Sequence, residues 1–151
     1  TIHRLLEFSP RAQRFERTAD HPIPADVVIV DEASMLDVQL ADALVETGAA
    51  IEAAGGRLAG IFFCPHAAAE GCDCRKPQLG LLRQVEAELG VAVEGRPLVG
   101  DKASDLQLAR LAGCEPILVR TGYGRATERQ ADLADVRVFA DLAAAAEALV
   151  G

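Results

Sequence analysis

The feature that most constrains the fold is an alternation of two apolar patterns between residues 78 and 150. Short runs of consecutive apolar residues predict buried strands, and longer segments with apolar residues three or four apart predict helices. Repeated strand-then-helix units are typical of a parallel sheet covered by helices on both faces. We therefore predict an α/β fold with strands at 97–99, 116–119 and 136–139 and helices at 78–89, 104–113 (capped by Ser104), 126–133 and 142–150.

The preceding residues extend this alternation toward the N-terminus. We expect a short helix from Thr1 to Phe8, a strand from Asp26 to Asp31, a long helix from Ser34 to Gly55 and a strand from Leu58 to Phe63. Ligands bind at the carboxyl ends of the strands in such sheets. The residues expected at those ends are Asp31, Cys64, Asp101 and Arg120.

Composition excludes several classes of protein. The 151 residues carry a net charge of −8, which argues against a general nucleic-acid binder because such a protein needs a basic face. No apolar run approaches the roughly 18 to 20 residues that span a bilayer. We expect a cytoplasmic domain that is monomeric and has no nucleic-acid or membrane partner.

Three of the four cysteines lie close together beside a histidine. Cys64-Pro65-His66 and Cys72-Asp73-Cys74 place three thiols and one imidazole within eleven residues. Three cysteines and one histidine form a closed tetrahedral zinc set, and sulfur ligands favour zinc over magnesium. The alternative is a set of incidental thiols near a surface histidine. Cys114 follows a predicted helix end and is expected to be a small buried apolar residue.

The two lysines form a second unusual feature, because the chain otherwise uses thirteen arginines. Lys76 lies in the segment CRKP and Lys102 in GDKASD, both beside predicted loops. This bias indicates that a compact ammonium group is needed at the two positions. The carboxylate of Asp101 is a suitable ligand for Mg²⁺, and Asp105 could orient Lys102. Alternatively, the two aspartates only cap a helix and Lys102 is solvated.

The segments FFCPH, CDCRKP, LVGDKASD and LVRTGYG resemble, in order and spacing, the haloacid dehalogenase superfamily. Within it they are most similar to the bacterial D-glycero-D-manno-heptose 1,7-bisphosphate 7-phosphatases of lipopolysaccharide heptose biosynthesis. The resemblance covers residues from about 50 to 151. It implies a Mg²⁺-dependent hydrolase that removes the 7-phosphate of a phosphorylated sugar through a phospho-aspartate.

The same resemblance implies roles for individual residues. A structural zinc ion would be held by Cys64, His66, Cys72 and Cys74. Lys76 would stabilise the transferring phosphoryl group and Arg75 would contact the substrate. Asp101 would bind Mg²⁺, with Lys102 beside it.

The chain lacks the nucleophile that this mechanism requires. The family carries a D-x-D-G-T motif after its first strand, and no D-x-D occurs in this sequence. Asp31 ends an apolar strand and is the candidate for a substitute nucleophile, but Ala33 stands where the second aspartate would be. We therefore predict a haloacid-dehalogenase-like sheet that lacks one central strand. A non-catalytic, zinc-stabilised α/β fragment is the alternative function.

The N-terminal part resembles a different protein. TIHRLLEF followed by ADVVIVDEASMLD is similar to the helicase alpha subunit of exonuclease V, with VVIVDEAS as its Walker B motif. A fragment of an ATP-dependent DNA helicase is thus a further alternative, although no G-x-x-x-x-G-K-[ST] motif is present to hold ATP. We expect residues 1–47 to form a helicase-like segment and residues 48–151 to form the C-terminal part of a phosphatase domain.

Overall fold

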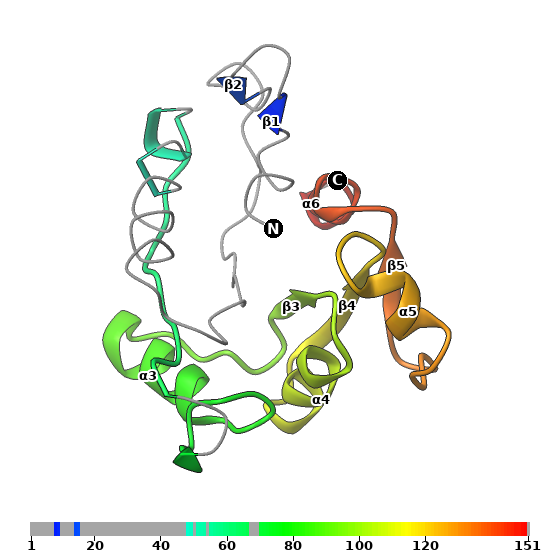
Figure 1. Ribbon diagram of the computed structural model, residues 1–151. Coiled ribbons are helices and arrows are strands. Elements are labelled where there is room, and N and C mark those ends of the chain that lie inside the picture. The colour runs from blue at the N-terminus through cyan, green and yellow to red at the C-terminus, as the bar shows by residue number, and fades with distance from the viewer. Residues whose placement is uncertain are drawn as a thin grey trace.

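The computed structural model describes residues 8–9, 14–15, 48–49, 51–53, 55–66 and 70–150. Its main body is a three-stranded parallel sheet in the order β3-β4-β5 (Figure 1). The strands are β3 (Pro97–Gly100), β4 (Glu115–Val119) and β5 (Arg137–Phe139). Helices alternate with them along the chain, namely α3 (Gly80–Leu89), α4 (Ala103–Leu111), α5 (Gly124–Glu128) and α6 (Leu142–Val150).

The sheet is covered on both faces, as the sequence predicts. Leu98 of β3 packs into an apolar cluster with Leu82 of α3 and Leu108 of α4. Successive residues of a strand point to opposite faces, and Val99 accordingly belongs to a second cluster, which contains Ala145 of α6. Helices α3 and α4 therefore lie on one face and α6 on the other.

Strand β4 is the centre of this sheet. Its register pairs Val99 with Ile117 on one side and Ile117 with Arg137 on the other. Ile117 and Leu118 have no exposed surface. Burial on both faces explains why this strand is a continuous apolar run with no polar alternation.

Helix α4 begins earlier than expected and is capped in a different way. The N-cap is Lys102, not Ser104. Asp105, in the first turn, accepts a hydrogen bond from the backbone N–H of Lys102 at 2.9 Å. A carboxylate there satisfies an amide that the helix leaves without a partner and lies favourably in the helix dipole.

Three other predictions of local structure differ from the observed elements. Phe8 lies in β1 (Phe8–Ser9), which pairs antiparallel with β2 (Arg14–Phe15), so the expected N-terminal helix does not include it. Residues 58–63 form no strand. Helix α5 covers residues 124–128 where 126–133 was expected, because backbone bonds from Ala126 and Thr127 to the carbonyl of Tyr123 start it earlier.

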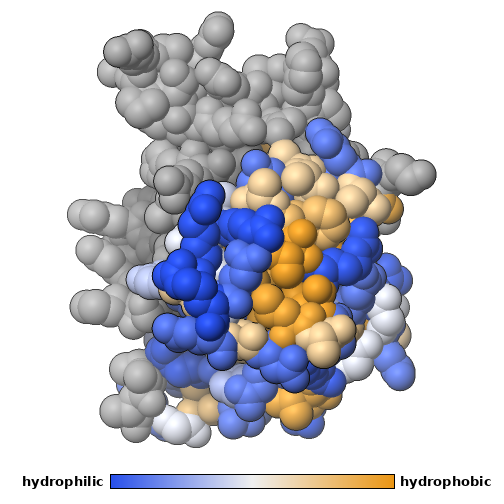
Figure 2. Space-filling model, turned by 90° about the vertical axis from the view of Figure 1, so that its right-hand side faces the viewer, coloured by the Kyte–Doolittle hydropathy of each residue, from blue (hydrophilic) through white to orange (hydrophobic). Residues whose placement is uncertain are grey.

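The strand expected at Asp26–Asp31 lies outside the described residues, as does most of the expected helix 34–55, of which residues 48–49 and 51–53 are helical. Among the described residues β3 has a strand on one side only, in agreement with a sheet that lacks a central strand. The face that includes β5 and α6 carries a strip of apolar side chains bordered by hydrophilic ones (Figure 2). None of the helices in the described part is long and apolar enough to cross a membrane.

Candidate metal and phosphate site

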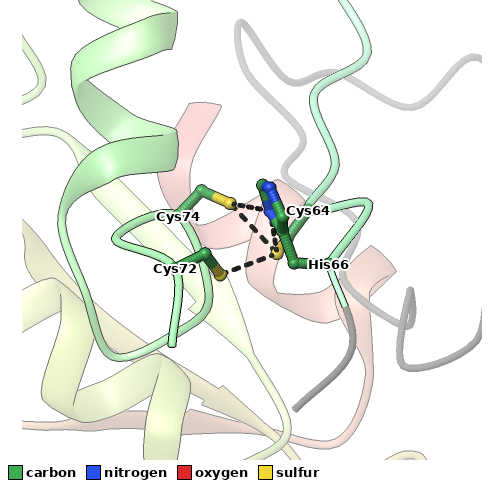
Figure 3. A group of neighbouring side chains, drawn as sticks. All are labelled: Cys64, His66, Cys72 and Cys74. Atoms are coloured by element: carbon green, nitrogen blue, oxygen red, sulfur yellow. Dashed lines mark hydrogen bonds between the residues drawn. The ribbon is translucent and has the colours of Figure 1, made fainter. Parts of the chain in front are cut away.

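The cysteine and histidine side chains converge from two stretches of chain that precede α3 (Figure 3). The four possible ligand atoms of Cys64, His66, Cys72 and Cys74 lie within 4.8 Å of one another. The Cys64 sulfur is 3.5 Å from the Cys72 sulfur and 3.1 Å from the Cys74 sulfur. The Nδ1 atom of His66 faces the same centre, 3.1 Å from the Cys74 sulfur and 3.7 Å from the Cys64 sulfur.

These separations suit a tetrahedral metal ion. With Zn–S bonds of about 2.3 Å and Zn–N bonds of about 2.0 Å, tetrahedral geometry requires S···S edges of about 3.8 Å and S···N edges of about 3.5 Å. The S···S separations of 3.1 and 3.5 Å are shorter than this edge, the two from Nδ1 of His66 are 3.1 and 3.7 Å, and no pair of ligand atoms exceeds 4.8 Å. Three sulfurs and one nitrogen leave no open position for water, so the donor set fits a structural zinc ion.

The thiols affect one another's ionisation. Desolvation acts to raise the pKa of Cys72, but hydrogen bonds from Cys64, Cys74 and two backbone N–H groups outweigh it and lower the pKa to about 7. Desolvation, together with Cys64 and Cys72, raises the pKa of Cys74 to about 12. One thiolate therefore forms readily and further ionisation is opposed, unless a cation at the centre stabilises the added negative charge.

Arg75 is directed back toward the metal-site loop, which consists of the segments 64–66 and 72–74 that carry the four possible ligands. Its Nη2 atom donates a hydrogen bond to the carbonyl oxygen of His66 at 2.5 Å, which joins the two stretches of the loop. Its Nε atom is buried without a hydrogen-bond partner. The structure thus places Arg75 beside the site, with one donor not used by the protein.

Lys76 follows the metal-site loop and reaches the carboxyl end of β3. Its Nζ atom lies 3.0 Å from Oδ1 of Asp105, and the two side chains are only 7% and 4% exposed. The other carboxylate oxygen of Asp105 accepts hydrogen bonds from the backbone N–H groups of Asp101 and Lys102, at 3.1 and 2.9 Å. One carboxylate therefore joins the lysine to the turn that carries Asp101.

The turn after β3 is held by the loop after β4. Oδ2 of Asp101 accepts a hydrogen bond from the backbone N–H of Tyr123 at 2.7 Å. The backbone carbonyl of Asp101 accepts one from the hydroxyl of Thr127 at 2.8 Å. The Lys102 ammonium lies 5.1 Å from the centre of the Tyr123 ring. Asp105 therefore binds the backbone of Lys102 in the first turn of α4, in agreement with the helix-cap alternative.

The structure brings together Lys76, Asp101 and Lys102 at one end of β3, beside the metal-site loop that Arg75 follows. Asp31 lies outside the described residues. Sequence reasoning did not identify the role of Asp105 as the partner of Lys76, nor the roles of Tyr123 and Thr127. The available signal for Asp105 was the scarcity of lysine, because a lysine retained in an arginine-rich chain needs a fitted acceptor.

Comparison with known proteins finds two families along the chain. Residues 73–145 match the HAD-hydrolase-like family, and residues 1–54 match the AAA domain family. The first match agrees with the resemblance to the haloacid dehalogenase superfamily, which is confirmed. The second is consistent with the helicase-like character of the N-terminal part.

Individual relatives are similar over the C-terminal part. The D-glycero-beta-D-manno-heptose-1,7-bisphosphate 7-phosphatase of Pseudomonas aeruginosa is 45% identical over 96 residues, which are 64% of this chain and 54% of the relative. The enzyme of the same name from Bordetella bronchiseptica is 48% identical over 97 residues, again 64% and 54% of the two chains. This chain therefore spans about half the length of the curated relatives it matches.

A solved structure supports the fold. The D,D-heptose 1,7-bisphosphate phosphatase of B. bronchiseptica, complexed with magnesium and phosphate, superimposes with a TM-score of 0.69 at 43% identity. The match covers 76% of this chain and 65% of the other.

Proposed function

We propose that residues from about 50 to 151, which are similar to haloacid-dehalogenase-type hydrolases, form the zinc-stabilised, phosphate-binding part of a phosphatase that acts on a sugar bisphosphate. The proposed substrate is heptose 1,7-bisphosphate, and the reaction is removal of its 7-phosphate. The names of the relatives support this substrate class. The cytoplasmic location and the monomeric state remain predictions from the sequence.

One observation carries the proposal. The Asp105 carboxylate holds the Lys76 ammonium and the Asp101 turn at the same end of β3. A cation and a carboxylate that bind a phosphate and a divalent metal must lie side by side, because the metal shares the phosphate oxygens.

The proposed roles follow from chemistry. Cys64, His66, Cys72 and Cys74 would hold zinc, which fixes the loop preceding Lys76. The Lys76 ammonium would donate to phosphoryl oxygens, and the free Nε–H of Arg75 would be directed toward a ligand oxygen. Asp101 would hold Mg²⁺, with Lys102 nearby. Mg²⁺ at this position would supply electrostatic neutralisation of the phosphate charge; the magnesium and phosphate in the related structure support this choice.

Turnover by this chain alone would require a nucleophile that the sequence does not supply in its usual form. Binding of phosphate would use Lys76, Arg75 and Mg²⁺ at Asp101, whereas hydrolysis also needs an attacking carboxylate and a general acid. We therefore propose phosphate binding for the chain as it stands, and hydrolysis only to the extent that Asp31 acts as a substitute.

Calorimetric titration of the zinc-loaded chain with inorganic phosphate and Mg²⁺ tests the binding proposal. We expect saturable binding that is lost in Lys76→Gln and retained in Arg83→Gln, which removes an exposed cation from α3. Absence of binding by the unchanged chain, or equal losses in the two variants, would contradict the proposal.

Release of inorganic phosphate from heptose 1,7-bisphosphate tests the hydrolysis proposal. We expect turnover far below that of a phosphatase with both aspartates, because the remaining groups only bind charge. Any activity should disappear in Asp31→Asn. Activity that is unchanged in this variant would exclude Asp31 as the nucleophile.

A further inference from the structure

Tyr123 is an exposed aromatic residue at the proposed phosphate site, and neither the metal nor the phosphate chemistry uses its ring. Its side chain is 58% exposed. Its backbone N–H donates to the Asp101 carboxylate at 2.7 Å, so the residue lies next to the proposed phosphate site. Single exposed aromatic residues are common on protein surfaces.

The backbone around Tyr123 is fixed by two glycines. Gly122 has φ of +59°, and a Cβ there would lie 2.0 Å from Oδ2 of Asp101. A Cβ at Gly124 would lie 1.8 Å from the carbonyl oxygen of Val119. Only glycine allows the chain to approach Asp101 and β4 this closely on either side of the tyrosine. The position of Tyr123 is therefore determined by the close contact of the loop after β4 with Asp101.

The ring is also paired with a cation. The Lys102 ammonium lies 5.1 Å from the ring centre, within the range of a cation–π interaction. Lys102 directly follows Asp101 in the turn at the end of β3, and Tyr123 is joined to this turn by its backbone hydrogen bond to Asp101. An apolar ring face and an ammonium donor lie together next to the proposed phosphate site.

We propose that Tyr123 and Lys102 form the subsite for the sugar part of a sugar phosphate. The ring would contact the C–H groups of the sugar, and the Lys102 ammonium would donate hydrogen bonds to its hydroxyl groups. Sugars present an apolar face and polar edges, and an amphipathic aromatic residue beside a hydrogen-bond donor complements both. This inference rests on the proposed function and adds the residues that distinguish a sugar phosphate from inorganic phosphate.

The composition of the chain provides a direct test. Tyr123 is the only tyrosine and there is no tryptophan, so near-ultraviolet tyrosine fluorescence reports on this one ring. We expect heptose 1,7-bisphosphate to change the fluorescence of the zinc- and Mg²⁺-loaded chain in a saturable way. Inorganic phosphate should bind without this change, because it does not reach the ring.

Calorimetry on variants distinguishes a direct contact between the Tyr123 ring and the sugar from an effect of the substitution on folding. Tyr123→Ala should weaken binding of heptose 1,7-bisphosphate by about tenfold, equivalent to about 1.4 kcal/mol, and leave inorganic phosphate binding unchanged. Tyr123→Phe should retain the affinity, because the ring face remains. Leu111→Ala, which removes another exposed apolar side chain (57% exposed), should have no effect on either ligand.

The outcomes distinguish the two proposals. If inorganic phosphate does not bind, the proposed function fails. If phosphate binds but heptose 1,7-bisphosphate neither changes the fluorescence nor loses affinity in Tyr123→Ala, the sugar subsite is refuted and the phosphate site stands.

Discussion

Replacing Asp105 by asparagine removes the negative charge from a buried ion pair and turns an amide donor toward the Lys76 ammonium. The Lys76 and Asp105 side chains are 7% and 4% exposed. The amide of asparagine can still accept the backbone N–H of Lys102, so the cap of α4 is retained while the charge opposite the ammonium is lost. Breaking a buried pair from one side costs about 3 to 5 kcal/mol, and we expect a value near 3 because the cap persists.

Urea denaturation followed by circular dichroism measures this loss. With a denaturant slope of about 1 to 3 kcal/mol per molar for a chain of this size, the midpoint should fall by about 1 to 3 M. The matched control is Glu115→Gln, which breaks the pair with Arg137, whose side chains are 38% and 42% exposed. Exposed pairs contribute about 0 to 1 kcal/mol, so this midpoint should hardly move.

A double-mutant cycle then isolates the pair. Lys76→Met combined with Asp105→Asn removes both charges, so the combined loss should be smaller than the sum of the two single losses. The reasoning is refuted if Asp105→Asn costs no more than Glu115→Gln, or if the single losses simply add.

Three further predictions concern the metal site and the response to acid. Elemental analysis should find about one zinc ion per chain, lost when Cys72 and Cys74 are both changed to serine and kept in Cys114→Ser. In the metal-free protein, alkylation by iodoacetamide should reach half its maximal rate near pH 7 at Cys72, whose pKa is lowered to about 7, and peptide mapping that finds Cys74 modified first would contradict this. The hydrogen bond from Arg120 lowers the pKa of Glu128 below 4.5, so its contribution to stability is present above pH 4.5 and is lost as the pH falls further. In Glu128→Gln, the free energy of unfolding should therefore fall less steeply with acid below that pH. An unchanged dependence of the free energy of unfolding on pH would exclude a contribution from Glu128.

Local patterns predicted the sheet well where the neighbouring strands are among the described residues. The apolar runs at 97–99 and 116–119 became β3 and β4, because each finds a parallel partner and a helix on its face. The metal-ligand cluster was visible because its four residues are close in sequence and of unusual type. These features depend on local spacing, which a sequence displays directly.

The contacts between distant segments could not be predicted in the same way. Lys76 and Asp105 are 29 positions apart, and Asp101 and Tyr123 are 22 apart. Such pairs depend on how the loops after β3 and β4 meet, and spacing along the chain does not encode that geometry. The pattern at Asp105 indicated a helix cap, which is correct. The pattern did not indicate that the other carboxylate oxygen of Asp105 binds Lys76.

The error at residues 58–63 has a physical cause that also bears on function. Their exposure alternates along the chain as in a strand, yet they form none, and Ile61 and Phe63 are 41% and 40% exposed. An extended apolar segment becomes a strand only when another strand supplies the partners for its backbone N–H and C=O groups. Within the described residues, β3 likewise has a strand on one side only. A strand on the open side of β3 would supply such partners, and none of the described residues forms it. The family resemblance predicts the D-x-D motif at the end of such a strand.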